Sequence, residues 1–471
     1  MQKENSRRRF IKSAGGALLL APVVSSIVGC SSTKSSAQNH LKQNSNAGTS
    51  NLILDVRDFG AKGNGTVKDT LSIQQAIDRC WVLGGGEVLM PAGNYLTGAI
   101  ALKSNVIICL EKDAVITGTA DFADYPVAQV RWEGKWMKGH VGLIYAFDAK
   151  NIGIIGAGKI VGNPALGGRP NAQYPLRHPA LIEMIGCDNI RLEDFSTSYR
   201  LMWSIHPTYC NNIFIKNLTI RSTGGNGDGI DIDSCKHVRI DNCDIDTGDD
   251  CIAIKSGRGM EGYTLLRTTE DVHITNCTFA DTIFACIGIG SETSGGIRNV
   301  LVENCKFTKA KTFAVYIKSR PGRGAFIEDI VCRNLDVSGT EGGFLRFNIL
   351  GSGLQDENPV PGDEGIPTIK NFSFSDVRVN GVPVLVDGSA IHPNKPLQGF
   401  TLTNVSGTCK KGIVLANIKN AKLKDVKVTG YEGPLLSIYN VEGRGFDGSA
   451  KLDAPKVPEP INSPVKKFKL H

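Results

Sequence analysis

The sequence lacks three patterns that would each indicate a particular class of protein. No patch of basic residues interleaved with aromatic ones argues for nucleic-acid binding, and we set that class aside. No two of the 13 cysteines have the CxxC spacing of a zinc site. An apolar stretch near the N terminus, Ala14–Val28, is too short for a permanent membrane span. Glycine is abundant instead, at 54 of 471 residues, and with short Val and Ile alternations it favours turn-rich β structure over helices.

The first 30 residues are typical of an export signal. Residues 6–12, Ser-Arg-Arg-Arg-Phe-Ile-Lys, resemble the twin-arginine signature, and the apolar stretch follows them. The stretch ends in Ile-Val-Gly-Cys30, which resembles a bacterial lipobox, so we expect Cys30 to be lipidated; a plain secretory signal is the alternative. Residues 31–51, rich in Ser, Asn, Gln and Lys, predict a flexible tether. We therefore expect a periplasmic or cell-surface bacterial lipoprotein that meets the membrane only through its anchor.

Twelve cysteines follow Cys30, and an exported protein invites a disulfide interpretation. Their positions favour a different one, because two sets of three share a repeat position: Cys187, Cys210 and Cys235, and Cys243, Cys277 and Cys305, the latter each after an asparagine. Small apolar thiols stacked inside successive coils explain this pattern better than bridges do. We expect mostly free, buried cysteines.

From about residue 100 to 440 the chain repeats one short phrase: alternate apolar residues, then Asn or Asp, then an apolar residue or cysteine. The phrase begins at Ile190, Ile213, Val238, Val272, Val300, Ile330, Phe372 and Phe400. Each copy predicts a short strand that ends in a turn, where Asn tolerates the left-handed conformation and can bind its counterpart on the next coil. Spacings of roughly 21 to 42 residues are typical of a parallel β-helix with variable loops. We therefore predict an all-β fold.

One helix is predicted ahead of this β region. Asp69 or Thr70 has the character of an N-cap, and the helix would continue to about Trp81. A helix there would cap the open end of the stack and shield its sheet edge. The predicted folded domain runs from residue 52 to 454. Residues 455–471, rich in proline and ending in basic residues, predict an irregular tail.

Three aspartates suggest where to look for chemistry. Aligning Ile232-Asp-Ser with Ile254-Lys-Ser places Asp228 at the same repeat position as Asp250, beside which lies Asp249. Neighbouring coils lie ~4.8 Å apart, so three carboxylates would crowd together and raise one another's pKa, as an acid catalyst requires. Side chains on adjacent coils could also span the ~6.5–9.5 Å between the carboxyl groups of an inverting glycosidase. The alternative is that these aspartates merely bind backbone amides in turns.

Two motifs around these aspartates carry a family resemblance. Gly248-Asp-Asp250 matches a Gly-Asp-Asp motif, and Asn226-Gly-Asp228 matches Asn-Thr-Asp with Gly in place of Thr. With residues 203–207 (Trp-Ser-Ile-His-Pro) and 320–324 (Arg-Pro-Gly-Arg-Gly), they make residues 52 to 440 similar to glycoside hydrolase family 28, the polygalacturonase group. The resemblance implies a right-handed parallel β-helix that inverts the anomeric centre of α-galacturonosidic linkages in pectic polysaccharides or oligosaccharides, with no metal or organic cofactor. It also implies that Asp249 is the general acid, while Asp228 and Asp250 hold and deprotonate the attacking water.

Two positions depart from the family pattern. Phe284 stands where the family has a histidine, and Tyr316, in Tyr316-Ile-Lys318, replaces the arginine of Arg-Ile-Lys. By the resemblance, that arginine and lysine grip the uronate carboxylate of the substrate. Arginine pairs with a carboxylate through two hydrogen bonds and tyrosine does not. The flat apolar face of a tyrosine suits a less charged sugar.

Four interpretations stay open at this point. The altered subsite accepts rhamnose beside galacturonate, as in rhamnogalacturonan, or Arg320 or Arg323 replaces the lost arginine on ordinary galacturonan. A third interpretation is a pectin-binding protein with little activity. A fourth is a pectate-lyase-type elimination, in which the three aspartates would bind calcium.

Four further residues are candidate contacts. We expect Lys318 to contact the substrate and Lys255 to meet a carboxylate, whereas His206 would line the cleft and Glu292 would lie beside it. The alternatives are a satisfied core histidine, a solvated lysine and a glutamate bound to loop amides. We expect a monomer.

Overall fold

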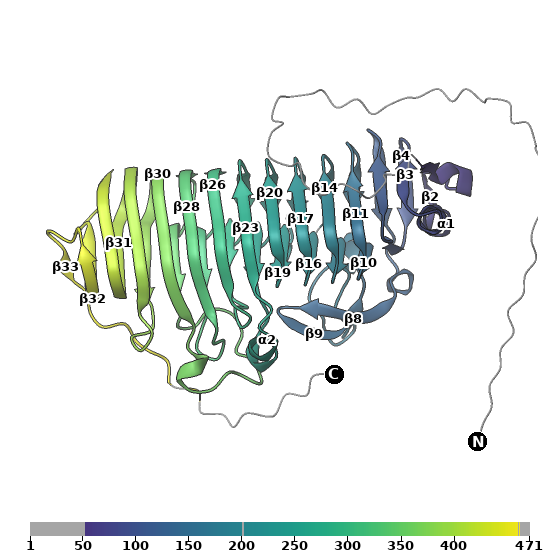
Figure 1. The fold of residues 1–471 in the computed structure, drawn as a ribbon. Helices are drawn as coiled ribbons and strands as arrows, with labels where there is room; N and C mark the ends of the chain where they lie inside the picture. Colours follow the sequence, from purple (N-terminus) through teal and green to yellow (C-terminus); the bar gives the residue numbers. More distant parts are fainter. Residues whose placement is uncertain (1–51, 200–201, 460, 462–471) are drawn as a thin grey trace, which may run out of the picture. The chain divides into compact units, whose positions relative to one another are not determined.

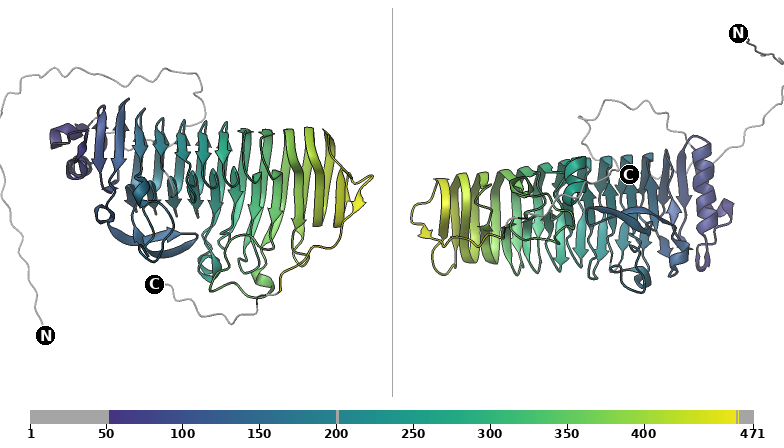
Figure 2. Two further views of the ribbon diagram at one scale, coloured as in Figure 1. Left: turned by 180° about the vertical axis from the view of Figure 1, so that it is seen from behind. Right: turned by 90° about the horizontal axis from the view of Figure 1, so that it is seen from below.

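The computed structural model describes residues 52–199, 202–459 and 461, so the predicted signal, Cys30 and the tether lie outside the described residues. Within them, 31 strands form one continuous parallel sheet that winds coil upon coil. The coils follow one another in sequence order from helix α1 (Thr70–Val82) to strand β33 (Ala450–Lys451) (Figures 1 and 2). The prediction of a parallel β-helix is confirmed.

The strands fall into three ladders of parallel neighbours. The first comprises β1 (Ile53–Asp55), β3 (Gly86–Met90), β6 (Val106–Leu110), β11 (Lys150–Ile155), β14 (Asp188–Glu193), β17 (Asn211–Lys216), β20 (Lys236–Asp241) and β23 (Thr269–Thr275). The second comprises β2 (Asn64–Lys68), β4 (Gly93–Thr97), β7 (Ala114–Gly118), β12 (Lys159–Val161), β15 (Ser196–Ser198), β18 (Thr219–Ser222), β21 (Asp244–Thr247) and β24 (Thr278–Thr282). The third comprises β5 (Ile100–Ala101), β10 (Ile144–Phe147), β13 (Ile182–Ile185), β16 (Ile205–Thr208), β19 (Ile230–Asp233), β22 (Ile252–Lys255), β25 (Ile287–Ile289), β27 (Phe313–Lys318) and β29 (Gly343–Asn348). The later coils are built from the longer strands β26 (Ile297–Phe307), β28 (Phe326–Ser338), β30 (Thr368–Ala390), β31 (Leu397–Thr429) and β32 (Leu436–Arg444).

The repeated phrase of the sequence is the register of the first ladder. Its eight starting residues pair in an unbroken series, from Ile190 opposite Ile213 to Phe372 opposite Phe400. All eight side chains are buried and belong to one hydrophobic core that runs along the inside of the coils. The alternation of inward and outward residues in each strand therefore fixes which face is buried.

The asparagines of the phrase also lie where the sequence predicts. Asn217, Asn242, Asn304 and Asn334 all have positive φ angles between 52° and 57°. Asn242 Nδ2 donates to Asn217 Oδ1 at 2.8 Å, and Asn334 Nδ2 donates to Asn304 Oδ1 at 2.7 Å. These ladders satisfy side-chain amides between coils, although Asn276 departs from the pattern and donates to Asp241 Oδ1 instead, at 2.6 Å.

The two predicted sets of cysteines are free and buried: Cys187, Cys210 and Cys235, and Cys243, Cys277 and Cys305. The amide of Cys187 lies 3.4 Å from Cys210 Sγ, and the amide of Cys210 lies 3.4 Å from Cys235 Sγ. The thiols of neighbouring coils are therefore stacked in the core at one repeat position. Burial raises the pKa of the Cys210 thiol well above its ordinary value, so this thiol is an inert packing group.

The predicted N-terminal helix is present as α1, with Ile73, Ala76 and Ile77 on its buried face. It packs against the first strands at the end of the stack (Figure 1). Asp69 occupies the N-cap position, yet its carboxylate caps no helix amide. It accepts instead from the amides of Lys62 and Gly63, at 2.7 and 2.9 Å, and so fixes the preceding glycine turn.

Two insertions that the sequence pattern does not predict lie on one side of the coils. They are the antiparallel hairpin of β8 (Val127–Trp132) and β9 (Lys135–His140), and helix α2 (Gly259–Leu265). Figures 1 and 2 show the hairpin running alongside the stack toward α2. A loop between β29 and β30, which contains the short 3-10 helix η4 (Asp363–Gly365), lies on the same side. Three more 3-10 helices are η1 (Val56–Phe59), η2 (Phe122–Asp124) and η3 (Pro164–Leu166).

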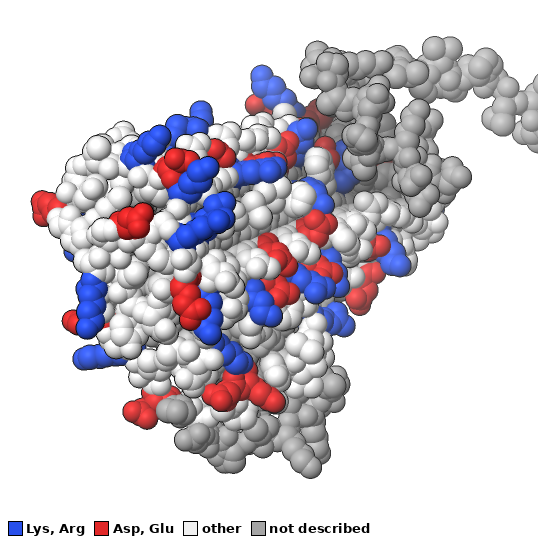
Figure 3. All heavy atoms as spheres, turned by 60° about the vertical axis from the view of Figure 1, so that its left-hand side comes forward, with Lys and Arg blue, Asp and Glu red and all other residues white. Residues whose placement is uncertain are grey.

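The coils also pair charges across their outer surface. On the face shown in Figure 3, cationic and anionic side chains are interspersed. Many pairs join neighbouring coils, as where Arg333 Nη2 lies 2.7 Å from Glu303 Oε2. Such exposed pairs contribute little stability each. Among the described residues, no helix is long and apolar enough to cross a membrane.

Candidate active site

The third ladder brings the three predicted aspartates together. Asp228 precedes β19 and Asp250 precedes β22, and the register of these strands places the two aspartates on adjacent coils. The amide of Gly229 donates to the carbonyl oxygen of Asp250 at 3.0 Å, which locks that register. One carboxylate oxygen from each of Asp228, Asp249 and Asp250 lies within 4.8 Å of the others. The predicted carboxylate cluster is therefore present in the fold.

The direction of Asp249, which alternation alone leaves open, is decided by its turn. The hydroxyl groups of Thr247 and Thr282 both donate to its carbonyl oxygen, the first at 2.7 Å. Its own carboxylate accepts from the amide of Asp250 at 3.0 Å. Glycine is required at position 248, because a Cβ atom there would lie 1.8 Å from the carbonyl oxygen of Gly224. These contacts aim the half-buried Asp249 side chain into the cluster.

Two lysines balance the charge of this cluster. Lys318 Nζ contacts the Asp250 carboxylate, while Lys255 Nζ contacts Asp231 and lies 3.6 Å from Asp228 Oδ2. The contact between Lys318 and Asp250 depends on Gly288, since a Cβ atom there would lie 2.5 Å from Asp250 Oδ2 and 2.9 Å from Lys318 Nζ. Both lysines are largely buried, so their ammonium groups are positioned by these carboxylates and not by solvent.

Burial and like charge shift the acids away from their ordinary behaviour. Burial, followed by the charge of Asp250, raises the pKa of Asp249. Burial, with Asp231 and Asp249, raises the pKa of Asp228 well above its usual range even though Lys255 opposes the shift. For Lys255, burial lowers the pKa, but Asp231 and Asp228 outweigh it and the pKa is raised well above the ordinary value. The cluster can thus keep a protonated carboxylic acid at a pH where isolated aspartates are ionised.

These groups line a cavity of about 290 Å³, a volume near the lower end of the usual range for small-ligand sites. Its predicted lining residues are Asp228, Asp249, Asp250, Lys255, Phe284, Glu292 and Lys318. Glu292 is buried, and although burial alone raises its pKa, Lys255 and Arg323 outweigh this and lower the pKa below the ordinary value. The cavity thus combines acids, fixed anions and buried cations, which suits a polar, anionic substrate.

A family model described as Glycosyl hydrolases family 28 matches residues 80–345, which include every aspartate of the cluster. The chain belongs to glycosyl hydrolase family 28. It is therefore a glycoside hydrolase, and the resemblance drawn from its motifs is confirmed.

Individual relatives agree with this membership. A probable polygalacturonase of Vitis vinifera is 29% identical over 362 residues, covering 74% of this chain and 73% of the relative. An exo-poly-alpha-D-galacturonosidase of Dickeya chrysanthemi is 27% identical over 419 residues, covering 75% and 69%. Among solved structures, a hyperthermoactive exopolygalacturonase from Thermotoga maritima matches with a TM-score of 0.71 and 25% identity, covering 81% of this chain and 93% of the other.

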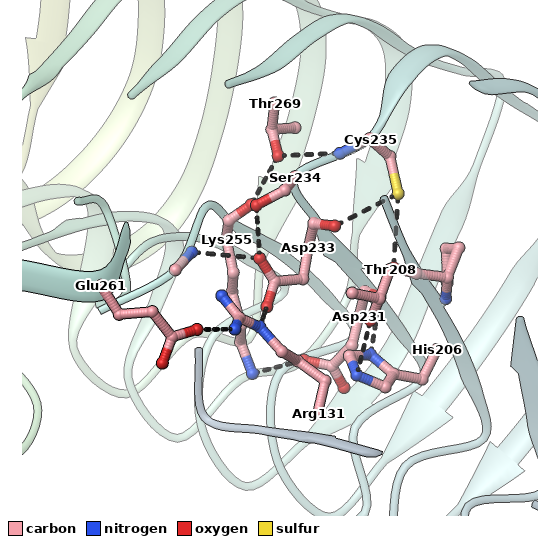
Figure 4. Close-up of polar contacts among 12 residues, drawn as sticks. Arg131, His206, Thr208, Asp231, Asp233, Ser234, Cys235, Lys255, Glu261 and Thr269 are labelled. Atoms are coloured by element: carbon pink, nitrogen blue, oxygen red, sulfur yellow. Dashed lines mark hydrogen bonds and ion pairs between the residues drawn. The ribbon is translucent and has the colours of Figure 1, made fainter. Parts of the chain in front are cut away.

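A buried ion network in this family 28 enzyme ties the hairpin and α2 to the catalytic coils (Figure 4). Arg131 of β8 places its Nε 3.0 Å from Asp233 Oδ2, at the end of β19, and its Nη1 against Glu261 of α2. Asp233 Oδ1 accepts from the amide of Gly257 at 3.0 Å. Arg131 and Asp233 are almost wholly buried. Because these charges are removed from water, they are stabilised only as a connected set.

Three sequence predictions are corrected by the fold. His206 does not line the cavity: it is buried, with Nδ1 3.2 Å from the carbonyl oxygen of Asp231 and Nε2 3.2 Å from Thr208 Oγ1. Burial lowers its pKa well below the ordinary value, so it is a neutral core histidine. Tyr316 also lies behind the cavity wall, stacked on Phe284 with the ring centroids 5.8 Å apart. Of these two aromatic rings, only that of Phe284 lines the cavity.

Arg320, the third of these predictions, has a structural partner, and so does Arg323. Arg320 Nη1 donates to the carbonyl oxygen of Gly353 at 2.6 Å, and Arg323 Nη2 donates to that of Leu354 at 2.6 Å. Arg323 is fully buried. Neither Arg320 nor Arg323 lines the cavity. Neither therefore replaces the family's arginine, whose position is occupied by Tyr316.

The cavity also contains residues that motif reasoning did not identify. Trp203 lines it and lies 4.7 Å from Lys255 Nζ, measured to the ring centroid. Glu133, Arg169 and Leu354 line it too, and each comes from an insertion between coils. Trp203 could have been found from the Trp-Ser-Ile-His-Pro motif. The other three carry no sequence signal, because insertions do not follow the coil repeat.

Proposed function

We propose that this enzyme hydrolyses α-galacturonosidic linkages in galacturonan or its oligosaccharides, with water as the nucleophile. The observation that carries the proposal is the cavity in which three carboxylates meet two buried lysines, Lys255 and Lys318. The carboxylates can supply an acid and a base, and the lysines offer positive charge to a uronate. The relatives named for galacturonan cleavage support the same substrate class.

In the proposed mechanism, Asp249 is the general acid. Its raised pKa keeps it protonated at a pH where an ordinary aspartic acid is ionised, so it can donate a proton to the leaving oxygen. Asp250, which contacts Lys318, shares with Asp228 the role of accepting the proton of the attacking water. Asp228, on the adjacent coil, holds that water from the other side. Lys255, 3.6 Å from Asp228, opposes the rise in the pKa of Asp228 and so favours its ionised form.

The stereochemical outcome is proposed from family membership, because the spacing alone does not favour inversion. The closest oxygens of the three aspartates lie within 4.8 Å of one another, below the ~6.5–9.5 Å between carboxyl groups in most inverting enzymes. Proton NMR of the fresh product checks the proposal: an α-linked substrate yields the β-anomer first if the reaction inverts. Initial release of the α-anomer would contradict a direct attack by water.

One experiment tests both the substrate and the reaction. The enzyme, produced without its signal, is incubated with polygalacturonate or with rhamnogalacturonan, in each case in the presence and in the absence of EDTA. We expect new reducing ends from polygalacturonate, saturated products, and a rate that EDTA leaves unchanged. Cleavage of rhamnogalacturonan alone would instead assign the altered subsite to rhamnose. Unsaturated products that need calcium would favour elimination, and no product from either polymer would favour a binding protein.

We further propose export to a bacterial envelope, with the protein anchored through a lipid on Cys30. The support is the sequence of residues 1–51 alone. In the expressing bacterium, the full-length chain is expected in the membrane fraction and the Cys30→Ala variant in the soluble fraction. Equal membrane association of both would contradict the anchor.

A further inference from the structure

The arginine that would grip a uronate beside Lys318 is absent, and its neighbours in the sequence do not replace it. Position 316 holds a tyrosine buried against Phe284. Arg320 and Arg323 donate to the backbone carbonyl groups of Gly353 and Leu354, and neither arginine lines the cavity. An enzyme that binds galacturonan still needs cations for the substrate carboxylates. This requirement directs attention to the arginine that does line the cavity.

Arg169 is that arginine, and it comes from the segment that follows η3. Its side chain is 57% exposed, and Nη1 lies 2.7 Å from Glu133 Oε1, its one hydrogen-bond partner among the described residues. The remaining guanidinium N–H groups are therefore available to a second carboxylate. A guanidinium offers five donors in a planar fork, so it can bind Glu133 and a ligand together.

Glu133, the partner of Arg169, is held in place by a chain of alternating charges. Glu133 Oε2 lies 3.2 Å from Arg258 Nη1, and Arg258 Nε lies 3.2 Å from Asp356 Oδ2. The charge is thus held by the hairpin turn, α2's N-cap residue and the loop before β30. A cation held in advance loses less conformational entropy on binding than a freely moving surface arginine does.

Aromatic contacts connect Arg169 to the catalytic acids. Its guanidinium lies 5.8 Å from the ring centroid of Trp132, and Trp132 stacks on Trp203 with centroids 4.8 Å apart. Trp203 in turn lies 4.7 Å from Lys255 Nζ, the group beside Asp228. Arg169 is therefore on the Asp228 side of the cavity, whereas Lys318 contacts Asp250.

We propose that Arg169 binds the carboxylate of a galacturonate residue on the Asp228 side of the cavity and selects for the free acid over its methyl ester. The inference rests on the proposed function, because it assumes a uronate-containing substrate. It makes the hairpin turn that carries Glu133, and the segment after η3 that carries Arg169, part of the specificity machinery. It also explains how this member of family 28, which lacks the family's arginine, can still bind a negatively charged substrate.

The test compares Arg169→Gln and Arg169→Lys with the matched control Arg191→Gln. Arg191 is also exposed, at 47%, and pairs with a glutamate, Glu193, at 2.8 Å, but it lies outside the cavity lining. Losing a charged hydrogen bond costs a factor of about 10 to 100 in affinity. We expect KM for oligogalacturonate to rise by about that factor in Arg169→Gln, less in Arg169→Lys, and to stay unchanged in the control. For the methyl-esterified oligosaccharide, the KM values of all variants should agree within about threefold.

A binding measurement separates this inference from the proposed function. Oligogalacturonate is titrated calorimetrically into Asp249→Asn protein with and without Arg169→Gln. Weaker binding caused by Arg169→Gln supports the inference even if the wild type hydrolyses no galacturonan, in which case only the proposed function fails. Unchanged affinity, or an equal loss for the free acid and the ester, overturns the role of Arg169 while leaving the proposed hydrolysis intact.

Discussion

Replacing Asp249 with asparagine removes the proposed acid and little else. The side chain keeps its shape, and its Oδ1 can still accept from the amide of Asp250. The hydroxyl groups of Thr247 and Thr282 bind the backbone oxygen of residue 249 and not its carboxylate, so the turn stays in place. The variant should therefore fold normally. It should also be no less stable to heat, because one of three crowded acids is gone.

The size of the activity loss follows from the chemistry. General acid catalysis contributes a factor of about 10² to 10⁴, so kcat on polygalacturonate should fall by that amount, or about 3–5 kcal/mol of activation free energy. A galacturonide with a good leaving group needs no proton donor, so Asp249→Asn should cleave it almost as fast as the wild type. This comparison distinguishes loss of the acid from loss of the fold.

The matched control is Asp246→Asn, another half-buried aspartate three positions earlier that does not line the cavity. It should retain activity on both substrates. Asp249→Asn protein that keeps a tenth or more of the wild-type kcat on polygalacturonate would refute the acid assignment. An equal loss on both galacturonides would also refute it, because that pattern indicates damage to binding or to the water-activating pair.

Three other predictions follow from the same contacts. Lys318→Met should reduce kcat/KM by about 10² or more, measured by reducing ends, because Asp250 is left as a buried carboxylate without its cation; unchanged activity would contradict a role for Lys318. Arg131→Met should lower the free energy of unfolding by about 3–5 kcal/mol, seen as an earlier denaturation midpoint, because Asp233 stays buried without its partner; an unchanged midpoint would show that this ion network is not needed. The raised pKa of Asp249 keeps this acid protonated at pH values at which an ordinary aspartic acid is already ionised. We therefore expect kcat to be retained at those pH values and to decline as the pH rises through the pKa of Asp249. A pH profile that declines at the pKa of a free aspartic acid would contradict this assignment.

Much of the fold could be predicted because its information is local and repeated. In each copy of the phrase that begins at Ile190 and Ile213, alternate residues are buried and an asparagine or aspartate takes a left-handed turn. These are backbone and burial preferences that each strand expresses in the same way, so the repeat predicts the register. The register then places Asp228 beside Asp250, which is why the repeat also predicts the acid cluster.

The wall of the cavity could not be predicted in this way. Residue 316 is a tyrosine in the sequence, but only packing against Phe284 decides that it lies behind the wall. Arg169 reaches the cavity because Glu133 pairs with it, from a turn 36 residues earlier in the chain.

The sequence by itself therefore determined the coil architecture, the buried thiols and the cluster of aspartates. The tertiary structure alone decided which cations and aromatic rings line the cavity. The physical reason is that strand register follows from a repeated local pattern. The insertions are instead held by ion pairs between segments far apart in the chain, such as Arg131 with Glu261, and no period in the sequence marks these partners.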